Sequence, residues 1–348
     1  MTLPAAGTPR SLQPSNRSDG PLLEVVHVTK HFPVDGPLFG RRAAKGPAVV
    51  HAVDDVNLQL FPGEVLGLVG ESGCGKSTLG RLILRLLEPT AGEIRFEGRN
   101  VLTANRRELF AMRRRMQVIF QDPYSSLNPR MRIGTILEEP LLIHRIGPPG
   151  RAGRDERRRR VAELLRQVGL DESAMAKYPH EFSGGQRQRI GIARALALEP
   201  VCIVADEPVS SLDVSIQAQN INLLEELQAA YRLSILFIAH DLHMVRHVSD
   251  RVAVMHLGRI VELADTETLF TNPKHPYTQA LLASAPKPDP AAKRDRPPLE
   301  GEPPSPIDLP PGCRFYSRCP KRIDDCLRED PPLREVGPGH QAACILAK

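Results

Sequence analysis

A glycine-rich octapeptide offers the first chemistry in this chain of 348 residues. Residues 70–77 read Gly-Glu-Ser-Gly-Cys-Gly-Lys-Ser and fit the phosphate-binding pattern G-x-x-x-x-G-K-[ST]. Glycines let successive backbone N–H groups converge on phosphate oxygens, and a following helix presents its positive end to the same anion. Lys76 would face the β- and γ-phosphates, and the Ser77 hydroxyl would bind Mg²⁺. The expected ATP-binding residues here are Gly70, Glu71, Ser72, Gly73, Cys74, Gly75, Lys76, Ser77 and Thr78.

Two carboxylates form the second group. Asp206 and Glu207 directly follow the apolar run Val201–Ala205. Carboxylates at the end of a buried strand are costly unless they serve a cation or a reaction. We expect Asp206 to help hold Mg²⁺ and Glu207 to orient and deprotonate an attacking water. A strand that merely ends in a polar turn would look the same, but the phosphate loop favours the catalytic interpretation. Together the two motifs predict a P-loop nucleoside triphosphatase.

A second anion site is indicated where Ser183, Gly184, Gly185 and Gln186 open a helix. Several N–H donors are exposed at the positive end of such a helix. A helix cap without a ligand is the alternative. At this point the sequence resembles the ABC ATPases, whose signature reads LSGGQ, with Phe182 standing where the family usually has Leu.

The resemblance implies roles for further residues. Gln121 matches the Q-loop, which contacts Mg²⁺ and water, and Asp213 belongs to the D-loop formed by residues 211–213. His240 matches the switch histidine that contacts the γ-phosphate. Phe32 stands where an aromatic ring stacks on adenine, although neighbouring His31 competes for that assignment. The implied catalytic residues are Glu207, His240 and Gln121, and the implied Mg²⁺ ligands are Ser77, Gln121 and Asp206.

The same family implies partners. Its ATPase subunits pair head to tail, so that each ATP lies between the phosphate loop of one and the signature of the other. Hydrolysis reopens the dimer, and the Q-loop with the helical subdomain passes this motion to membrane subunits. A non-catalytic cassette would be expected to lack Lys76 or Glu207, and both are present. We therefore expect a competent ATPase.

Two stretches narrow the resemblance. Residues 121–130 and 272–278 resemble importers of di- and oligopeptides, and with the cysteine-bearing tail the likeness runs from Leu23 to Cys344. The F-type ATPase subunit of these importers is the most similar. This implies a second, related ATPase chain, two membrane permease subunits and, indirectly, an extracytoplasmic binding protein. The chain would lie peripherally on the cytoplasmic face of the inner membrane. Nickel and some glycan importers share the subfamily, so the cargo stays open.

Four of the six cysteines lie in the tail. Cys74 and Cys202 are explained as small apolar residues. Four thiolates suit zinc or an iron–sulfur cluster, although the spacing lacks the tight C-x₂-C of zinc ribbons. The family resemblance favours a [4Fe–4S] cluster, and zinc or no metal are the alternatives. The four tail cysteines are Cys313, Cys319, Cys326 and Cys344.

These residues need strands and helices to position them. Short apolar runs alternate with helical patterns from residue 22 to about 270, which predicts an α/β fold with a mainly parallel sheet. Strands are expected at Glu24–Val28, Val65–Val69, Ile94–Phe96, Val118–Phe120, Val201–Ala205, Ile235–Ala239 and Arg251–Met255. Helices are expected at Lys76–Leu87, Ile133–Arg145, Arg157–Val168, Gln186–Leu198, Ile216–Ala230 and Tyr277–Ser284.

The predicted architecture is a P-loop (RecA-like) core of ABC type with an inserted helical subdomain and a small cysteine-containing C-terminal extension. We expect a disordered tail over residues 1–20, the ATPase domain over 21–270 with the helical subdomain at about 129–199, and the extension over 271–348. Because the extension is rich in Pro, Lys and Arg, it needs a staple or is loosely ordered.

Composition limits the other classes. No apolar run approaches the length of a membrane span, and residues 1–20 lack the apolar core of a signal peptide. The net charge of +5 comes largely from Arg151–Arg160, which reads as a solvated helix face rather than a contact for nucleic acid or lipid. A soluble ABC ATPase acting on nucleic acid or ribosomes would carry two cassettes or a long coiled coil, and neither is present. No nucleic-acid partner is expected.

Overall fold

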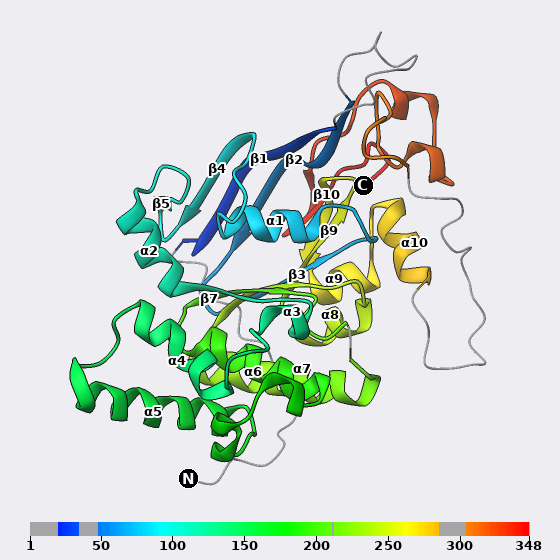
Figure 1. Cartoon of the computed structure of the whole chain (residues 1–348). Helices are drawn as coiled ribbons and strands as arrows, with labels where there is room; N and C mark the ends of the chain where they lie inside the picture. Colours follow the sequence, from blue (N-terminus) through cyan, green and yellow to red (C-terminus); the bar gives the residue numbers. More distant parts are fainter. Residues whose placement is uncertain (1–19, 35–47, 211, 285–303, 348) are drawn as a thin grey trace, which may run out of the picture.

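The computed structural model describes residues 20–34, 48–210, 212–284 and 304–347. They form two sheets with helices packed between and beneath them (Figure 1). The tail expected over residues 1–20 lies, except for Gly20, outside the described residues. Among the described helices, none has the length and apolar character needed to span a bilayer.

The larger sheet has eight strands in the order β11-β12-β10-β9-β3-β8-β7-β6. The five strands from β9 to β6 are parallel, and β10, β12 and β11 continue the sheet in antiparallel fashion. The parallel strands are β3 (Val65–Val69), β6 (Met116–Ile119), β7 (Cys202–Asp206), β8 (Ser234–Ile238) and β9 (Arg251–His256). Every residue of β3, β7 and β8 is buried, as expected for strands covered on both faces.

Parallel strands bring the segments that follow them to one edge of the sheet. The phosphate loop follows β3, Gln121 lies just beyond β6, Glu207 follows β7 and His240 lies just beyond β8. Because β6, β7 and β8 are adjacent parallel strands, Gln121, Glu207 and His240 lie next to one another along the carboxyl edge of the sheet. The predicted mainly parallel α/β sheet is confirmed, and it is this topology that assembles the site.

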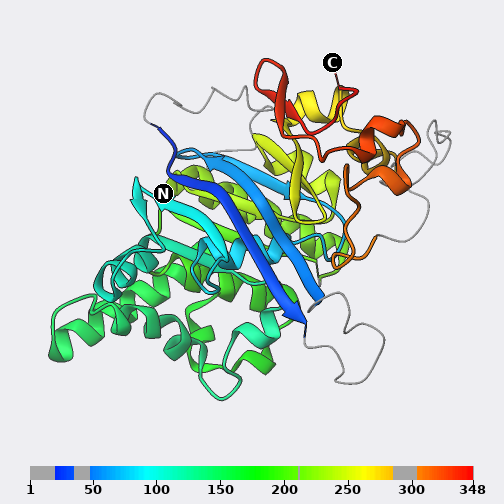
Figure 2. The same ribbon diagram turned by 90° about the horizontal axis from the view of Figure 1, so that it is seen from above.

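A second, four-stranded sheet is antiparallel, in the order β2-β1-β4-β5. Its strands are β1 (Leu23–Val34), β2 (Ala48–Leu60), β4 (Ala91–Phe96) and β5 (Arg99–Asn100). Leu79, Leu82 and Ile83 of helix α1 (Lys76–Ile83) share one apolar core with residues of both sheets. Figure 2 shows β1 and β2 lying side by side over the rest of the chain. Helix α1 ends four residues before its predicted end at Leu87.

The opposite face of the large sheet carries the helical part of the chain (Figure 1). Only helical elements occur between residues 129 and 199: α4 (Ile133–Ile143), α5 (Gly150–Gln167), the 3₁₀ turns η3 (Glu172–Ala176) and η4 (Pro179–Glu181), and α6 (Gly184–Leu196). Helix α5 begins seven residues before the predicted start at Arg157. Its first turns are highly charged, so they show no apolar stripe that periodicity could detect.

The remaining helices border the two sheets. They are α2 (Arg106–Arg115), α3 (Pro123–Ser126), α7 (Val214–Tyr231), α8 (Leu242–Val248), α9 (Thr266–Thr271) and α10 (Pro276–Ser284). Helix α2 has a complete capping box, in which Asn105 and Glu108 each accept a backbone N–H from the other.

The described C-terminal residues are joined to the large sheet. Strand β12 (His340–Ala342) pairs with β10 (Arg259–Asp265), and β11 (Arg334–Gly337) pairs with β12. The buried Phe315 and Cys319 belong to the main apolar core. The segment is therefore held by strand pairing with the large sheet and by packing into the core. Its own composition did not predict these contacts.

Candidate functional site

The phosphate loop has the backbone that its glycines require. Gly73 and Gly75 have φ values of 78° and 111°, in the left-handed region that favours glycine. A β-carbon on Gly75 would lie 2.1 Å from the carbonyl oxygen of Ala52, and one on Gly70 would lie 2.1 Å from that of Met255. Any side chain at these two positions would collide with neighbouring backbone.

Lys76 lies inside this loop. Its ammonium donates to the carbonyl oxygens of Gly70 (2.8 Å) and Glu71 (3.0 Å), and the residue is only 4% exposed. It also donates to the Cys74 sulfur (3.8 Å), so its partners among the described residues are two neutral carbonyls and a thiol. A buried ammonium group with such partners lacks a counter-ion, and a triphosphate would supply one. The loop thus fits an anionic ligand.

The Mg²⁺ ligands expected from the two motifs lie next to each other. The Ser77 hydroxyl donates to Asp206 Oδ1 over 2.8 Å. Burial raises the pKa of the Asp206 carboxyl and the nearby Glu207 raises it further, against the lowering effect of the Ser77 hydrogen bond. A divalent cation would relieve this desolvation, and hydroxyl and carboxylate oxygens are ligands that Mg²⁺ prefers. These residues therefore fit the ion.

The three expected catalytic residues converge on one carboxylate. Gln121 Nε2 donates to Glu207 Oε2 over 2.9 Å, and His240 Nδ1 lies 3.3 Å from the same oxygen. Glu207 itself has a left-handed backbone, with φ of 45°. Its N–H donates to the carbonyl of Ile238, the last residue of β8. The structure thus brings Gln121, Glu207 and His240 together beside Asp206.

The signature residues form a helix N-terminus elsewhere. Ser183 Oγ accepts the N–H of Gln186 (3.3 Å), and the Gln186 side chain accepts the N–H of Ser183 (3.0 Å). This is the helix cap named as the alternative, with both side chains exposed. Gly185 is pressed against α7, where a β-carbon would lie 2.3 Å from Ile216 Cγ2.

Helices α1 and α6 pack on opposite faces of the large sheet. Leu66 and Leu68 of β3 share a core with α1, whereas Val65 and Val69 share the other core with α6. Within the described residues, the side chains of Ser183 and Gln186 each accept the other residue's backbone N–H, and no bond from them to the phosphate loop is seen. A single chain does not bring its signature to its own loop.

For Asp213 and Phe32, two further predicted ATP-binding residues, the structure gives positions but no hydrogen bond or ion pair with the other described site residues. Asp213 is the exposed N-cap of α7, and its D-loop neighbour Ser211 lies outside the described residues. Phe32 lies half-buried on β1 opposite Val50, with the Lys30 ammonium 5.0 Å from its ring centre. His31, its competitor, lies 3.2 Å from Asp54 through Nε2.

Sequence reasoning missed two side chains that touch the phosphate loop. The N–H of Glu71 donates to the hydroxyl oxygen of Tyr277 (2.9 Å), and the Glu71 carboxylate takes two hydrogen bonds from Arg318 (2.7 and 2.9 Å). Tyr277 lies in the segment 272–278 that resembles peptide importers. No sequence signal pairs it or Arg318 with the loop.

The four tail cysteines surround one small pocket with His275 and Phe315. Burial raises the pKa of Cys313 to about 11 and also raises that of Cys319. Within the described ranges, no three of these sulfurs lie within 4.8 Å of one another. A zinc ion with four sulfurs at ~2.3 Å would need them about 3.8 Å apart. The four cysteines thus line one pocket, but no three of their sulfurs are as close together as a bound zinc ion would require.

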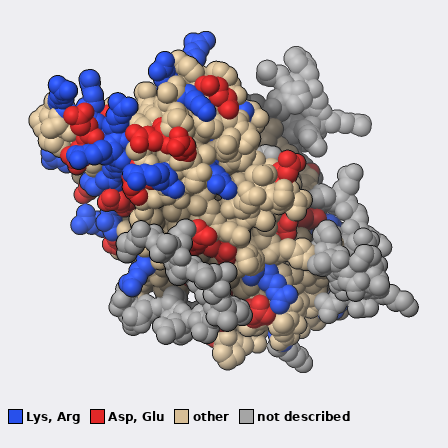
Figure 3. Space-filling view, turned by 90° about the horizontal axis from the view of Figure 1, so that it is seen from below, with Lys and Arg blue, Asp and Glu red and all other residues tan. Residues whose placement is uncertain are grey.

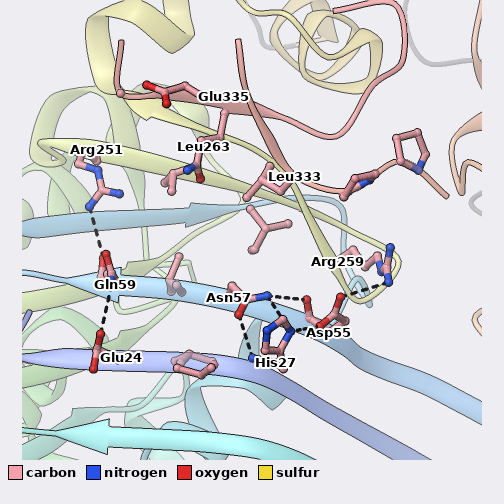
Figure 4. Close-up of a pocket in the computed structure, with 18 residues that line it drawn as sticks. Glu24, His27, Asp55, Asn57, Gln59, Arg251, Arg259, Leu263, Leu333 and Glu335 are labelled. Carbon is pink, nitrogen blue, oxygen red and sulfur yellow. Dashed lines mark hydrogen bonds and ion pairs between the residues drawn. The ribbon is translucent and has the colours of Figure 1, made fainter. Parts of the chain in front are cut away.

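Another cavity, of about 560 Å³, lies between β1, β2, β10 and the tail (Figure 4). Several of its polar groups are paired with one another: His27 with Asp55 (2.6 Å), Asp55 with Arg259 (3.5 Å) and Arg251 with the Gln59 carbonyl (3.3 Å). No predicted site residue lines it. The cavity is separate from the nucleotide residues.

The Arg-rich stretch lies on α5. Lys and Arg side chains gather on the side of the lower face where α4 and α5 lie (Figure 3). Most arginines between 151 and 160 are exposed, and the half-buried Arg157 and Arg160 pair with Glu138 (2.9 Å) and Glu199 (2.8 Å). The stretch is the solvated helix face that its composition indicated.

Comparisons with known proteins agree with this geometry. The profile of the family described as "ABC transporter" matches residues 53–210, and that described as "Oligopeptide/dipeptide transporter, C-terminal region" matches residues 261–326. A putative peptide import ATP-binding protein of Brucella ovis is 52% identical over 328 residues, covering 94% of this chain and 98% of that protein. An oligopeptide transport ATP-binding protein of Bacillus subtilis is 50% identical over 328 residues, covering 93% and 97%.

Solved structures place the fold in the same family. The ATP-binding cassette MJ0796, in a dimeric post-hydrolysis state bound to ADP and Pi, matches with a TM-score of 0.61 and 28% identity over 70% of this chain and 98% of its own. Cassette fold, assembled motifs and relatives about half identical over nearly their whole length agree. The chain belongs to the ATP-binding proteins of ABC transporters, in the branch that carries the oligopeptide/dipeptide transporter C-terminal region.

Proposed function

We propose that this chain is the ATP-hydrolysing subunit of an importer for di- or oligopeptides. The observation that carries the ATPase activity is the convergence of Gln121 and His240 on Glu207, beside the Ser77–Asp206 pair. The cargo rests on the C-terminal profile and on relatives named as peptide import proteins. Nickel import, the alternative cargo, is not favoured by any of these relatives.

Each residue at the sheet edge has a role in this proposal. Lys76 and the loop amides bind the β- and γ-phosphates. Glu207 orients the attacking water and takes its proton, Gln121 holds that carboxylate in place, and His240 contacts the γ-phosphate. Phe32 stacks on the adenine. When Mg²⁺ is bound, by Ser77, Asp206 and Gln121, it neutralises charge on the phosphates.

The signature acts on a second subunit. Ser183, Gly185 and Gln186 lie at an exposed helix end, remote from the chain's own phosphate loop. They would complete the ATP site of a partner ATPase in a head-to-tail pair, and Asp213 would line the same interface. Dimeric MJ0796 with ADP and Pi supports this arrangement. The partner we propose is a related but different ATPase chain.

The helical elements between residues 129 and 199 are the proposed subdomain that passes closure to two membrane permease subunits. The ATPase domain would span residues 21–270 and the extension 271–348. The protein would then lie on the cytoplasmic face of the inner membrane, and a separate extracytoplasmic protein would deliver the peptide.

For the cysteine pocket we propose a [4Fe–4S] cluster held by Cys313, Cys319, Cys326 and Cys344. Support comes from four cysteines that line one pocket, because four cysteine thiolates are the usual ligands of such a cluster. When present, the cluster would supply a cross-link between β12 and the loops that carry the first three cysteines.

The cargo is tested in cells with Glu207→Gln, which removes the catalytic carboxylate and keeps the fold. Uptake of labelled dipeptide, labelled hexapeptide and nickel is measured in a strain whose only copy of the chain is the variant. We expect peptide uptake to be lost and nickel uptake to be kept. Loss of nickel uptake with intact peptide uptake would contradict the assignment of peptides as the cargo, while the proposed ATPase role would still hold.

A further inference from the structure

Glu71, the second residue of the phosphate loop, is held by hydrogen bonds with two residues that lie outside the ATPase motifs. The N–H of Glu71 donates to Tyr277, 206 positions later in the chain, and its carboxylate is paired with Arg318, 247 positions later. Tyr277 is the second residue of helix α10, and Arg318 ends the 3₁₀ turn η5 (Tyr316–Arg318), directly before Cys319. Both the backbone and the side chain of Glu71 are therefore held by the C-terminal part of the chain.

These contacts are partly buried and directional. The Arg318 guanidinium meets the Glu71 carboxylate with both of its terminal nitrogens, and its side chain is 6% exposed. Such two-point, charge-assisted pairs are the strong class of hydrogen bond and fix orientation as well as distance. The Glu71 end is 22% exposed, so solvent screens the pair only partly. Arg318 can therefore hold Glu71 in one orientation.

Tyr277 is locked in place by its surroundings. It is fully buried. The centre of its ring lies 4.3 Å from the ring centre of His256 and 5.4 Å from that of Phe315. Its N–H donates to His275 Nδ1 (3.0 Å), and the N–H of His275 is in turn accepted by the buried Glu262 (3.0 Å). The hydroxyl is thus presented to the loop by a rigid support that reaches back to strand β10.

The held residue is also one that Lys76 uses. The carbonyls of Glu71 and Gly70 accept the Lys76 ammonium, while the Glu71 N–H is turned away to Tyr277. When the peptide between Gly70 and Glu71 is fixed, the start of the phosphate loop has one conformation. The amides that follow and Lys76 then need not become ordered when nucleotide binds. Less ordering on binding means higher affinity.

We infer that Tyr277 and Arg318 are positioning residues for the phosphate loop: acting through Glu71, they pre-form the loop for the triphosphate and so set the affinity for ATP. This rests on the proposed ATP site and assigns a role to the family segment 272–278 and to the tail. Neither residue touches the reacting atoms. They should alter binding rather than the rate of the chemical step.

The test compares Tyr277→Phe and Arg318→Ala with wild type in the full chain. Binding is titrated with a fluorescent ATP analogue, and kcat and KM are measured separately. We expect Kd and KM to rise about three- to tenfold in each variant, as for the loss of one such bond, with kcat within about twofold. Lys321→Ala is the matched control, because Lys321 lies on the same segment and its ammonium donates to the half-buried Gln279 (2.9 Å) and not to Glu71. It should bind like wild type.

A double-mutant cycle separates positioning from general loss of structure. In a Glu71→Gln background, Arg318→Ala should add little, because the pair is already weakened. Full additivity, unchanged Kd in Tyr277→Phe, or a fall in kcat alone would overturn the inference. Circular dichroism melts in the absence of nucleotide verify that each variant is folded. If wild type itself failed to bind ATP, the proposed function would fail instead, which keeps the two outcomes apart.

Discussion

Glu207 is the residue on which the site depends most. A left-handed backbone costs a residue with a β-carbon about 1 kcal/mol or more, and neighbours must hold it there. The Glu207 N–H is held by the Ile238 carbonyl, and its carboxylate is held by Gln121. This conformation turns the carboxylate away from the line of β7, beyond Asp206 and toward Gln121 and His240. An observed strain of this kind is expected where chemistry requires an unusual direction.

The Lys76 and Ser77 variants separate phosphate binding from metal binding. Lys76→Ala should weaken ATP binding with or without Mg²⁺, because the charge facing the triphosphate is removed. Ser77→Ala should weaken it only when Mg²⁺ is present. Titration with a fluorescent ATP analogue, with and without EDTA, measures both. Unchanged affinity in Lys76→Ala would mean that the loop does not bind phosphates as described.

His256 gives the folded protein a sensitivity to acid. Burial lowers the pKa of His256 to about 3, so the folded chain keeps it neutral, whereas an unfolded chain protonates it near pH 6.5. Between those values the unfolded state binds more protons, and stability is lost as the pH falls from about 6.5 towards 3. Urea melts should give a stability slope of up to about 1.4 kcal/mol per pH unit from this group. The slope should be shallower in His256→Gln, and an equal slope in both proteins would contradict the assignment.

At the scale of elements, the packing of α6 on α7 sets where the signature lies. Gly185→Ala would push a β-carbon into Ile216, and overpacking of this kind costs about 1–3 kcal/mol. Gly191→Ala, on the same helix, has nothing within 4 Å and should stabilise by about 0.5–1 kcal/mol. Chemical denaturation and ATPase assays of both variants provide the comparison. We expect only Gly185→Ala to lose activity, and equal behaviour would argue against a packed signature.

The parallel strands were the predictable part of the fold. Val65–Val69 was predicted with its observed bounds, and β7 and β8 within one residue, because long apolar runs mark strands covered on both faces. Strand β2 (Ala48–Leu60) was missed, because His, Asp, Asn and Gln interrupt its apolar residues. Strand β10 was missed because it carries the buried Glu262. The Glu262 carboxylate accepts hydrogen bonds from His340 Nε2 (2.7 Å) and from two backbone N–H groups, and only the folded chain brings these partners to it.

The site residues show the same division. Lys76, Asp206 and Glu207 were predicted from local motifs that follow strands, whereas Gln121 and His240 were predicted only from the resemblance to ABC ATPases. The strand order then brings all five residues to one edge of the sheet. The contacts of Glu71 could not be predicted, since nothing in the local sequence specifies a partner more than 200 positions away.

For the molecule as a whole, Arg318 and Phe315 connect the cysteine pocket to the ATP site. Arg318 is the neighbour of Cys319, and Phe315 lines the pocket while packing on Tyr277. Anaerobically purified protein should be brown, with broad absorbance from an iron–sulfur cluster. Cys319→Ser should bleach it and loosen the tail to proteases.

The same variant tests the connection to the phosphate loop. Cys319→Ser should still bind ATP, but with a raised Kd, and this rise should be absent when Glu71→Gln is already present. Colourless protein with one zinc would replace the cluster by the alternative metal. Metal-free protein with a protease-resistant tail would refute both metals.

The central claim, that this chain hydrolyses ATP through Glu207, is tested most directly by phosphate release from purified Glu207→Gln and wild type, each prepared free of other ATPase chains. The account predicts that the variant binds ATP as well as wild type and is held by it as a dimer. Its turnover should fall by about a hundredfold or more, the usual loss for such a group. Hydrolysis by Glu207→Gln near the wild-type rate would contradict the account.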